Sequence, residues 1–127
     1  MIKLKPLAEQ TYEPIKVGAS RLADTQHPDT EVIPQNEISA RLAKVGAKDW
    51  TVEVNEKGII QIRLERKFED YKKTLKFVND VAKIAEKMDH HADIFFNYDT
   101  VTMTIFSHSH NAITIKDIEF ADAVSKK

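Results

Sequence analysis

The chain has 127 residues, of which 42% are hydrophobic and 31% charged, and its formal net charge is -1. This size and balance fit one globular domain and are too apolar for a chain that is disordered throughout. The near-neutral charge argues against general binding to nucleic acids or anionic membranes, because both need a basic surface. Without cysteine, no disulfide, zinc-thiolate site or cysteine nucleophile can form. We therefore expect a cytoplasmic protein whose partners are small molecules or other proteins.

Residues 1–35 are expected to form an irregular N-terminal arm ahead of a folded domain, residues 36–127. All four prolines of the chain fall within the arm: Pro6, Pro14, Pro28 and Pro34. The arm sustains no hydrophobic period and has no apolar run typical of a signal peptide. Nowhere does the chain approach the roughly eighteen consecutive apolar residues of a membrane-spanning helix. A solvated tail is the favoured interpretation, and docking on the domain or on a partner protein is the alternative.

Residues 36–45 are predicted to form the first helix. Its apolar side chains recur on one face: Ile38, Leu42 and Val45. Asn36 can cap the start of this helix, and Gly46, which adopts a positive φ easily, can end it.

The next stretch changes to a period of two, which is typical of a half-buried strand. Alternate apolar side chains run through it in two groups: Trp50, Val52 and Val54, then Ile60, Ile62 and Leu64. Between the groups, residues 55–58 carry the asparagine and glycine expected of a turn. The pattern predicts a β-hairpin with one wet face.

Residues 69–88 return to a period of 3.6 and predict the longest helix. We expect its buried stripe to consist of apolar side chains spaced four, three, four and three apart: Tyr71, Leu75, Val78, Ala82 and Ala85. A second hairpin, rich in aromatic and β-branched residues, is predicted over residues 93–97 and 99–106. The last helix is predicted over residues 114–124, where Thr114 to Asp117 fit a capping-box-like start.

This order of elements lacks the regular strand-helix alternation of a parallel sheet. We predict an α+β fold, in which three helices cover one face of a four-stranded antiparallel sheet, in the order α-β-β-α-β-β-α. A sheet this small leaves edge strands open, and an open edge is commonly protected by pairing with another subunit. We therefore expect a homo-oligomer, either a homodimer or a homotetramer.

Four of the five histidines fall in two short clusters at predicted strand ends: His90 with His91, and His108 with His110. Histidine exchanges protons near neutral pH, so rings that converge from two strand ends could act as acid and base. Glu86 and Asp89 lie within a turn of the first cluster and could orient its rings. In the second, His110 falls on the same side as His108 if the chain stays extended.

Each cluster also has an ordinary structural interpretation. Adjacent histidines at a helix C-terminus can simply interact with the helix dipole, and the second cluster can be a polar loop. A zinc site is a further alternative, since the second cluster could chelate zinc with a third imidazole from the first.

Other polar residues give weaker signals. The chain has no glycine-rich phosphate loop and no G-x-S-x-G motif, so Ser107 and Ser109 lack the setting of an activated nucleophile. Lys116 and Asp117 lie beside the second cluster, where a capping carboxylate and a solvated lysine are at least as reasonable as a catalytic role.

The stretch AEKMDHHADIFFNYDTVTMTIFSH, followed by AITIKDI, resembles the pterin-4a-carbinolamine dehydratase family. The family pattern joins an acidic residue, a histidine pair, an aromatic residue, a third histidine and an aspartate. These stand here in register without gaps: Glu86, His90-His91, Tyr98, His108 and Asp117. The resemblance covers residues 36–125, and the predicted order of elements agrees with the fold of that family.

The resemblance implies dehydration of a 4a-hydroxytetrahydropterin to the quinonoid dihydropterin, a step in recycling the cofactor of aromatic amino-acid hydroxylases. This reaction moves protons to the leaving hydroxyl and from a ring nitrogen, which histidines can do without a metal or a cofactor. His91 and His108 are the expected proton-transfer pair, and His90 is expected to stabilise the leaving hydroxyl. Further pocket residues are implied by the resemblance: Glu86, Asp89, Ala92, Ser107, Ser109 and Asp117.

The chain departs from the usual family pattern beside these residues. Ala92 stands where proline is usual, Ser107 where threonine is usual, and Ala112 where glycine is usual. Some members of the family resemble binding proteins instead, including a dimerisation cofactor of a homeodomain transcription factor and an assembly chaperone of Rubisco. We favour the dehydratase, because clustered imidazoles give a pure scaffold no evident advantage. A non-catalytic assembly factor with a protein client on the N-terminal arm is the alternative.

Overall fold

The structure is a computed structural model that describes residues 31–127. Most of the expected N-terminal arm, residues 1–30, lies outside the described residues. Val32 forms an isolated antiparallel bridge with Thr114, and the Ile33 N–H donates to the Ile113 carbonyl at 2.8 Å. The segment just before the first described helix is therefore paired with the segment just before the last one.

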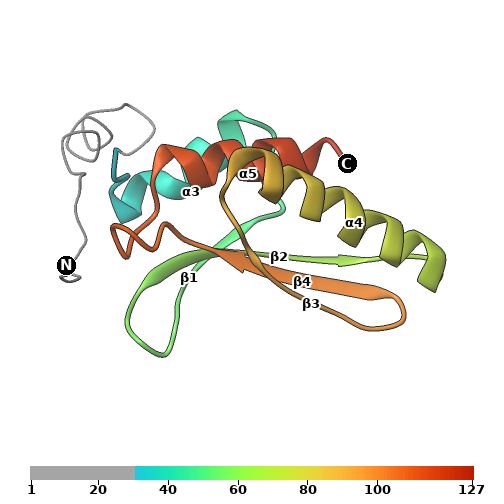
Figure 1. Ribbon diagram of the computed structural model, residues 1–127. Coiled ribbons are helices and arrows are strands. Elements are labelled where there is room, and N and C mark those ends of the chain that lie inside the picture. The colour runs from blue at the N-terminus through green and yellow to red at the C-terminus, as the bar shows by residue number, and fades with distance from the viewer. Residues whose placement is uncertain (1–30) are drawn as a thin grey trace, which may run out of the picture. The chain divides into compact units, whose positions relative to one another are not determined.

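In the described part, three helices cover one face of a four-stranded antiparallel sheet (Figure 1). The elements, labelled as in Figure 1, are α3 (Gln35–Lys44), β1 (Thr51–Val54), β2 (Ile60–Lys67), α4 (Tyr71–Met88), β3 (Asp93–Phe96), β4 (Thr100–Ile105) and α5 (Ile115–Ser125). The strand order β1-β2-β4-β3 makes β1 and β3 the edges of the sheet. The predicted α+β fold and its element order are confirmed. None of these described helices is long and apolar enough to cross a membrane.

The two faces of the sheet differ as the period of two predicts. On the covered face, buried side chains of the two central strands lie opposite one another: Ile62 with Ile105, and Leu64 with Met103. The residues that alternate with them are polar and lie on the face without helices: Arg63 and Glu65 of β2, and Thr102 and Thr104 of β4. The hydrophobic core is therefore confined to the space between the sheet and the helices.

The first helix begins differently from the prediction. Pro34 occupies the N-cap position, the helix starts at Gln35, and Asn36 lies inside it without capping it. Proline suits a helix start because its fixed φ is close to the helical value and it has no N–H to satisfy. The predicted end is confirmed, since Gly46 follows the helix with φ 81°. Two of the predicted inward residues are fully buried: Ile38 and Leu42.

The predicted buried stripe of α4 is wrong. The side chains that face the core are Thr74, Phe77, Val81 and Ala85. Of the predicted stripe only Ala85 is buried, while Tyr71 and Leu75 are exposed. The helix therefore turns a neighbouring face to the sheet, and part of its apolar stripe remains open to solvent.

Thr74 and Phe77 explain this rotation. The Thr74 hydroxyl lies 2.9 Å from the Asp70 carbonyl oxygen and 3.0 Å from that of Tyr98, so its polar group is satisfied inside the core. Phe77 packs against the Phe68 ring, with 5.1 Å between the ring centroids. The Arg66 guanidinium lies over the Phe77 ring, 4.6 Å from the centroid of that ring. These contacts direct the face that carries Thr74 and Phe77 toward the core.

We expect Phe77→Ala to lower the free energy of unfolding by about 3–5 kcal/mol, because it empties a packed core position. Leu75→Ala, the matched change on the open stripe, is expected to cost about 0.5 kcal/mol or less. Urea unfolding in dilute solution, followed by circular dichroism, measures both. Equal losses would put Leu75 in the core and contradict this packing.

Candidate functional site

The end of α4 determines where the first histidine pair points. Asp89 follows the helix with φ 52°, and its N–H donates to carbonyls of the last turn, so it ends the helix. Aspartate tolerates this left-handed conformation better than most residues do. The chain then enters β3 three residues after His90. Asp89 was expected in the pocket, and here its backbone sets the direction in which His90 and His91 leave the helix.

The two adjacent histidines have different surroundings. The His90 side chain is 12% exposed, and its Nε2 lies 2.6 Å from Oδ1 of Asp117. Its ring also meets the Phe120 ring edge-on, with 6.3 Å between centroids. His91 is 57% exposed, and its Nε2 lies 2.9 Å from Oε1 of the exposed Glu86. One imidazole is therefore held inside the protein, and its neighbour faces solvent.

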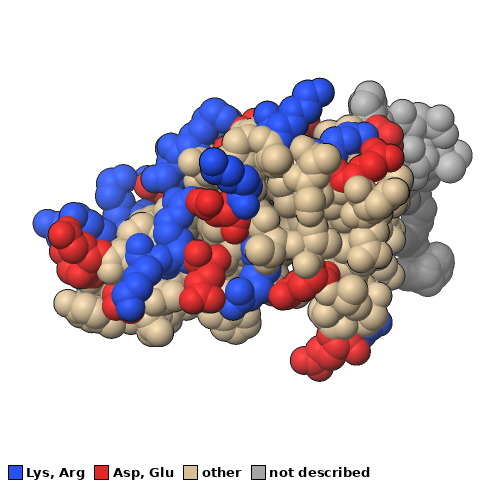
Figure 2. Space-filling view, turned by 180° about the vertical axis from the view of Figure 1, so that it is seen from behind, with Lys and Arg blue, Asp and Glu red and all other residues tan. Residues whose placement is uncertain are grey.

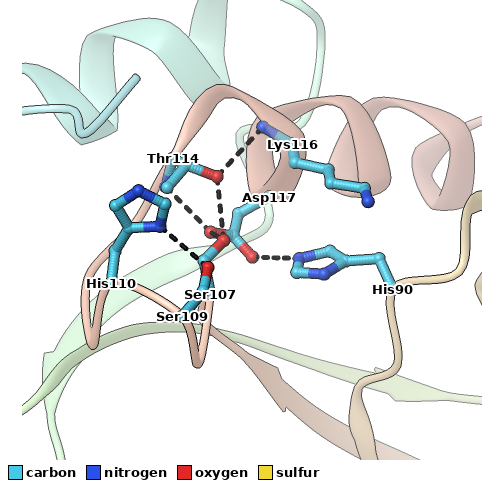
Figure 3. A network of polar contacts seen from close by, with 7 residues as sticks. All are labelled: His90, Ser107, Ser109, His110, Thr114, Lys116 and Asp117. Atoms are coloured by element: carbon cyan, nitrogen blue, oxygen red, sulfur yellow. Dashed lines mark hydrogen bonds and ion pairs between the residues drawn. The ribbon is translucent and has the colours of Figure 1, made fainter. Parts of the chain in front are cut away.

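Asp117 is the centre of a buried polar network (Figure 3). Its Oδ2 accepts hydrogen bonds from the Ser107 hydroxyl and from the Thr114 N–H, each at 2.8 Å. Oδ1 faces His90. Thr114 and Asp117 form the capping box of α5, so the predicted capping role is confirmed. The same carboxylate also holds a histidine, which the capping pattern alone does not reveal.

The donors around Asp117 assign the tautomer of His90. An ionised carboxylate has acceptors only, and all three groups directed at Asp117 can donate. We therefore infer that His90 Nε2 carries a proton and donates to Oδ1, which leaves Nδ1 as the free ring nitrogen. A carboxylate that fixes the tautomer and the orientation of an imidazole is a recurring arrangement in sites that use histidine.

His108 lies in the turn that follows β4. Ser107 and Ala112 form an antiparallel bridge, and the four residues between them make a turn. The His108 ring lies 4.2 Å from the Phe106 ring, centroid to centroid, at 34°. Its side chain is exposed. The third histidine of the pattern is thus supported by an aromatic neighbour but remains open to solvent.

The condition under which His110 would lie on the same side as His108 is not met, because the chain turns between Ser107 and Ala112 and does not stay extended. His110 N–H donates to the Ser107 carbonyl at 3.1 Å, which closes the turn. Its Nδ1 lies 2.9 Å from the Ser109 hydroxyl oxygen. Within residues 31–127, no three His, Asp or Glu side chains are grouped as a metal ion would require. The described residues therefore do not form the three-ligand zinc site that was considered as an alternative.

Comparison with known proteins agrees with this geometry. The family model for pterin 4 alpha carbinolamine dehydratase matches residues 31–127. The chain belongs to this family. A provisionally named pterin-4-alpha-carbinolamine dehydratase of Sulfolobus acidocaldarius is 31% identical to it over 94 residues, which are 74% of this chain and 96% of that protein.

Two solved structures resemble this family member. One is a transcriptional coactivator/pterin dehydratase from Brucella melitensis, with a TM-score of 0.65 and 28% identity, over 76% of this chain and 97% of that one. The other is a pterin dehydratase-like protein identified as a RuBisCO assembly factor in the alpha-carboxysome. It gives a TM-score of 0.53 at 19% identity, over 61% of this chain and 87% of that one. At such identity, the second likeness concerns the fold alone.

The structure accommodates each of the three departures from the family pattern. Ala92 is half-buried and packs against the core. Ser107 keeps the hydroxyl of the usual threonine and directs it at Asp117. Near Ala112, the positive φ is carried by Asn111, at 48°, and asparagine adopts it readily. The turn that presents His108 therefore forms without glycine at position 112.

The expected site residues fall into separate groups in this pterin dehydratase family member. One network contains His90, Ser107 and Asp117. Glu86 contacts His91 only, while Asp89 ends α4 and Ser109 pairs with His110. Sequence reasoning did not include Thr114, Phe106 or Phe120 in the site. The capping box was a signal for Thr114, whereas the aromatic contacts with histidine depend on tertiary packing.

Asp117→Asn is expected to lower the free energy of unfolding by about 1–3 kcal/mol. An amide offers one acceptor oxygen, so its NH₂ group must face either His90 or the donors on Oδ2. Glu119→Gln, on the exposed side of α5, is the control and should change stability by less than about 0.5 kcal/mol. Urea unfolding of both variants measures the two changes in the free energy of unfolding. A wild-type midpoint for Asp117→Asn would show that the network contributes little.

Proposed function

We propose that this chain is a dehydratase that removes water from a 4a-hydroxytetrahydropterin by histidine acid–base chemistry. The supporting observation is the position of three imidazoles at one end of the sheet. The start of β3 pairs with the end of β4, Asp93 opposite Thr104. His91 shortly precedes β3 and His108 shortly follows β4, so both lie at the same end of neighbouring strands. Both are exposed, and His90 beside them is held by a buried carboxylate.

The proposed reaction consists of one bond cleavage and two proton transfers. The C4a–O bond breaks, and the hydroxyl accepts a proton and leaves as water. The electron pair of the adjacent ring nitrogen forms the new C=N bond, and the ring system releases one proton to a base. Nothing is oxidised or reduced in this step. Imidazoles suit both roles, because they exchange protons near neutral pH.

The surroundings of each histidine suggest its role. His90 is held in one orientation by Asp117, and when its Nδ1 takes up a proton the ring can donate a hydrogen bond to the leaving hydroxyl. His91 and His108 are exposed and can meet a substrate that arrives from solution. We assign them the two proton transfers, with Glu86 orienting His91 and Phe106 supporting His108.

A non-catalytic assembly factor is the second candidate function. It is favoured by the fold likeness to the RuBisCO assembly factor and by exposed aromatic side chains on the β3–β4 hairpin. Phe95 is 68% exposed and Tyr98 64% exposed, which is unusual for residues of this size. A protein client on the N-terminal arm would involve residues outside the described part. We prefer the dehydratase, because partner binding gives no role to the two exposed imidazoles of His91 and His108.

We also propose that a second copy of the chain covers the open edge of the sheet at β3. Phe95, Phe96 and Tyr98 lie on or next to this edge and are exposed, and Tyr98 stacks on the exposed Tyr71 of α4. In Figure 2, charges of both signs are mixed over much of the visible face, while an uncharged margin lies at the lower left, the end at which Figure 1 places the β3–β4 turn. An apolar strand edge of this kind favours a symmetric partner, because a two-fold axis pairs the same edge with itself.

Phe96→Lys is expected to lower the molar mass of the protein in solution to that of the 14.5 kDa monomer, because it places a charge in the apolar edge. Val54→Lys makes the same change on the opposite edge strand, β1, and should leave the oligomer intact. Size-exclusion chromatography with light scattering measures both. A monomeric wild type, or dissociation by Val54→Lys alone, would refute the β3 interface.

Stopped-flow measurement of 4a-hydroxytetrahydropterin breakdown tests the dehydratase. Wild type should accelerate the reaction, and His91→Ala and His108→Ala should each lower the rate by about 100-fold or more, as expected when a general acid or base is lost. His110→Ala is the matched control and should keep most of the rate, since its ring pairs with Ser109 in the turn.

A chelator in every reaction removes any contribution from contaminating metal. Circular dichroism shows whether each variant keeps the wild-type fold. Failure of folded wild type to accelerate breakdown would refute the dehydratase and favour the assembly factor. Full activity in both His91→Ala and His108→Ala would refute the assigned proton transfers.

A further inference from the structure

Hydrogen bonds connect Ser107 to both histidine clusters. Through its backbone it closes the turn that carries His108: its N–H donates to the Ala112 carbonyl at 2.9 Å, and its carbonyl accepts from His110. Its buried side chain lies 2.8 Å from Asp117 Oδ2, and Asp117 in turn contacts His90. A single residue therefore connects the turn after β4 with the imidazole that follows α4.

The hydroxyl groups around Ser107 form a chain with one direction. The Lys116 N–H donates to Thr114 Oγ1 at 3.2 Å. The Ser107 hydroxyl has one proton, which it donates to Asp117, so it must accept at its 2.8 Å contact with Thr114 Oγ1. The order is therefore Lys116 to Thr114, Thr114 to Ser107, and Ser107 to Asp117 (Figure 3).

This chain restricts how the Asp117 carboxylate can turn. The terminal torsion of an aspartate is broad, and rotation about it exchanges the two carboxylate oxygens. Here two donors, from Ser107 and Thr114, hold Oδ2, so Oδ1 is the oxygen left for His90. Without the Ser107 hydroxyl, only the Thr114 N–H would hold Oδ2. The carboxylate would then be freer to leave His90.

We propose that Ser107 is a positioning residue for the dehydration, acting through Asp117 to keep His90 in one tautomer and one orientation. The catalytic part of this inference rests on the proposed function. It differs from the pterin contact that the resemblance implies, since the hydroxyl is turned toward Thr114 and Asp117 in the protein interior. The Ser107 side chain acts on the reaction only through Asp117 and His90.

Ser107→Thr and Ser107→Val form the test pair, because the two side chains have nearly the same shape and differ in the hydroxyl. Nitrogen-15 NMR of the histidine rings, without pterin and at about pH 8 where unperturbed imidazole is neutral, reports the tautomer of His90. We expect the Nε2–H form in wild type and in Ser107→Thr, and a mixture of both tautomers in Ser107→Val. The kcat of Ser107→Val should fall about tenfold with KM unchanged, as for one lost hydrogen bond to a charged group.

Identical ring signals in the two variants, or an Nδ1–H form of His90 in wild type, would overturn the inference. Should the larger side chains prevent folding, Ser107→Ala replaces Ser107→Val, with Ser39→Ala on the exposed surface of α3 as its control. The ring spectra separate the two proposals because they need no substrate. A tautomer that depends on Ser107 in a protein without turnover would sustain the positioning of His90 and refute the dehydratase. Normal turnover with one fixed tautomer in Ser107→Val would sustain the dehydratase and refute the positioning of His90 by Ser107.

Discussion

The fully buried carboxylate of Asp117 is the constraint on which the rest of this site depends. A charged group inside a protein is costly unless hydrogen bonds replace the water that it has lost. Its three donors come from three places: His90 after α4, Ser107 after β4 and Thr114 at the start of α5. These segments must therefore come together before the carboxylate is satisfied. The packing of the fold and the geometry of the site are set by the same group.

The position of Asp117 in α5 adds to its stabilisation. It lies in the first turn of the helix, where unpaired N–H groups and the helix dipole favour negative charge. The capping box uses Oδ2, so Oδ1 is free to accept from a group outside the helix. The carboxylate that caps α5 therefore also binds His90, and the hydrogen bonds of the capping box stay intact.

Local patterns predicted most of the fold, and long-range contacts account for what they missed. The two hairpins followed from alternation of side chains, which depends on neighbours in sequence. The buried face of α4 was wrong because Thr74 counts as polar until its partner is known, and the Tyr98 carbonyl lies 24 positions away. The pairing of His90 with Asp117 spans 27 positions and depends on how α5 packs beside α4. Glu86 and His91, only five positions apart, could be associated from sequence.

The three imidazoles differ in what the folded protein needs from them. His90 contributes to the stability of the structure, because it satisfies a buried carboxylate, and a member of this family without catalytic activity would have the same reason to keep it. His91 and His108 satisfy no buried group. Holding two exposed side chains in place costs conformational entropy, and the described part of the fold gains no buried hydrogen bond from either of them in return. A substrate that binds both rings can offset it, so these two exposed histidines, more than the fold or the buried pair, distinguish an enzyme from a scaffold.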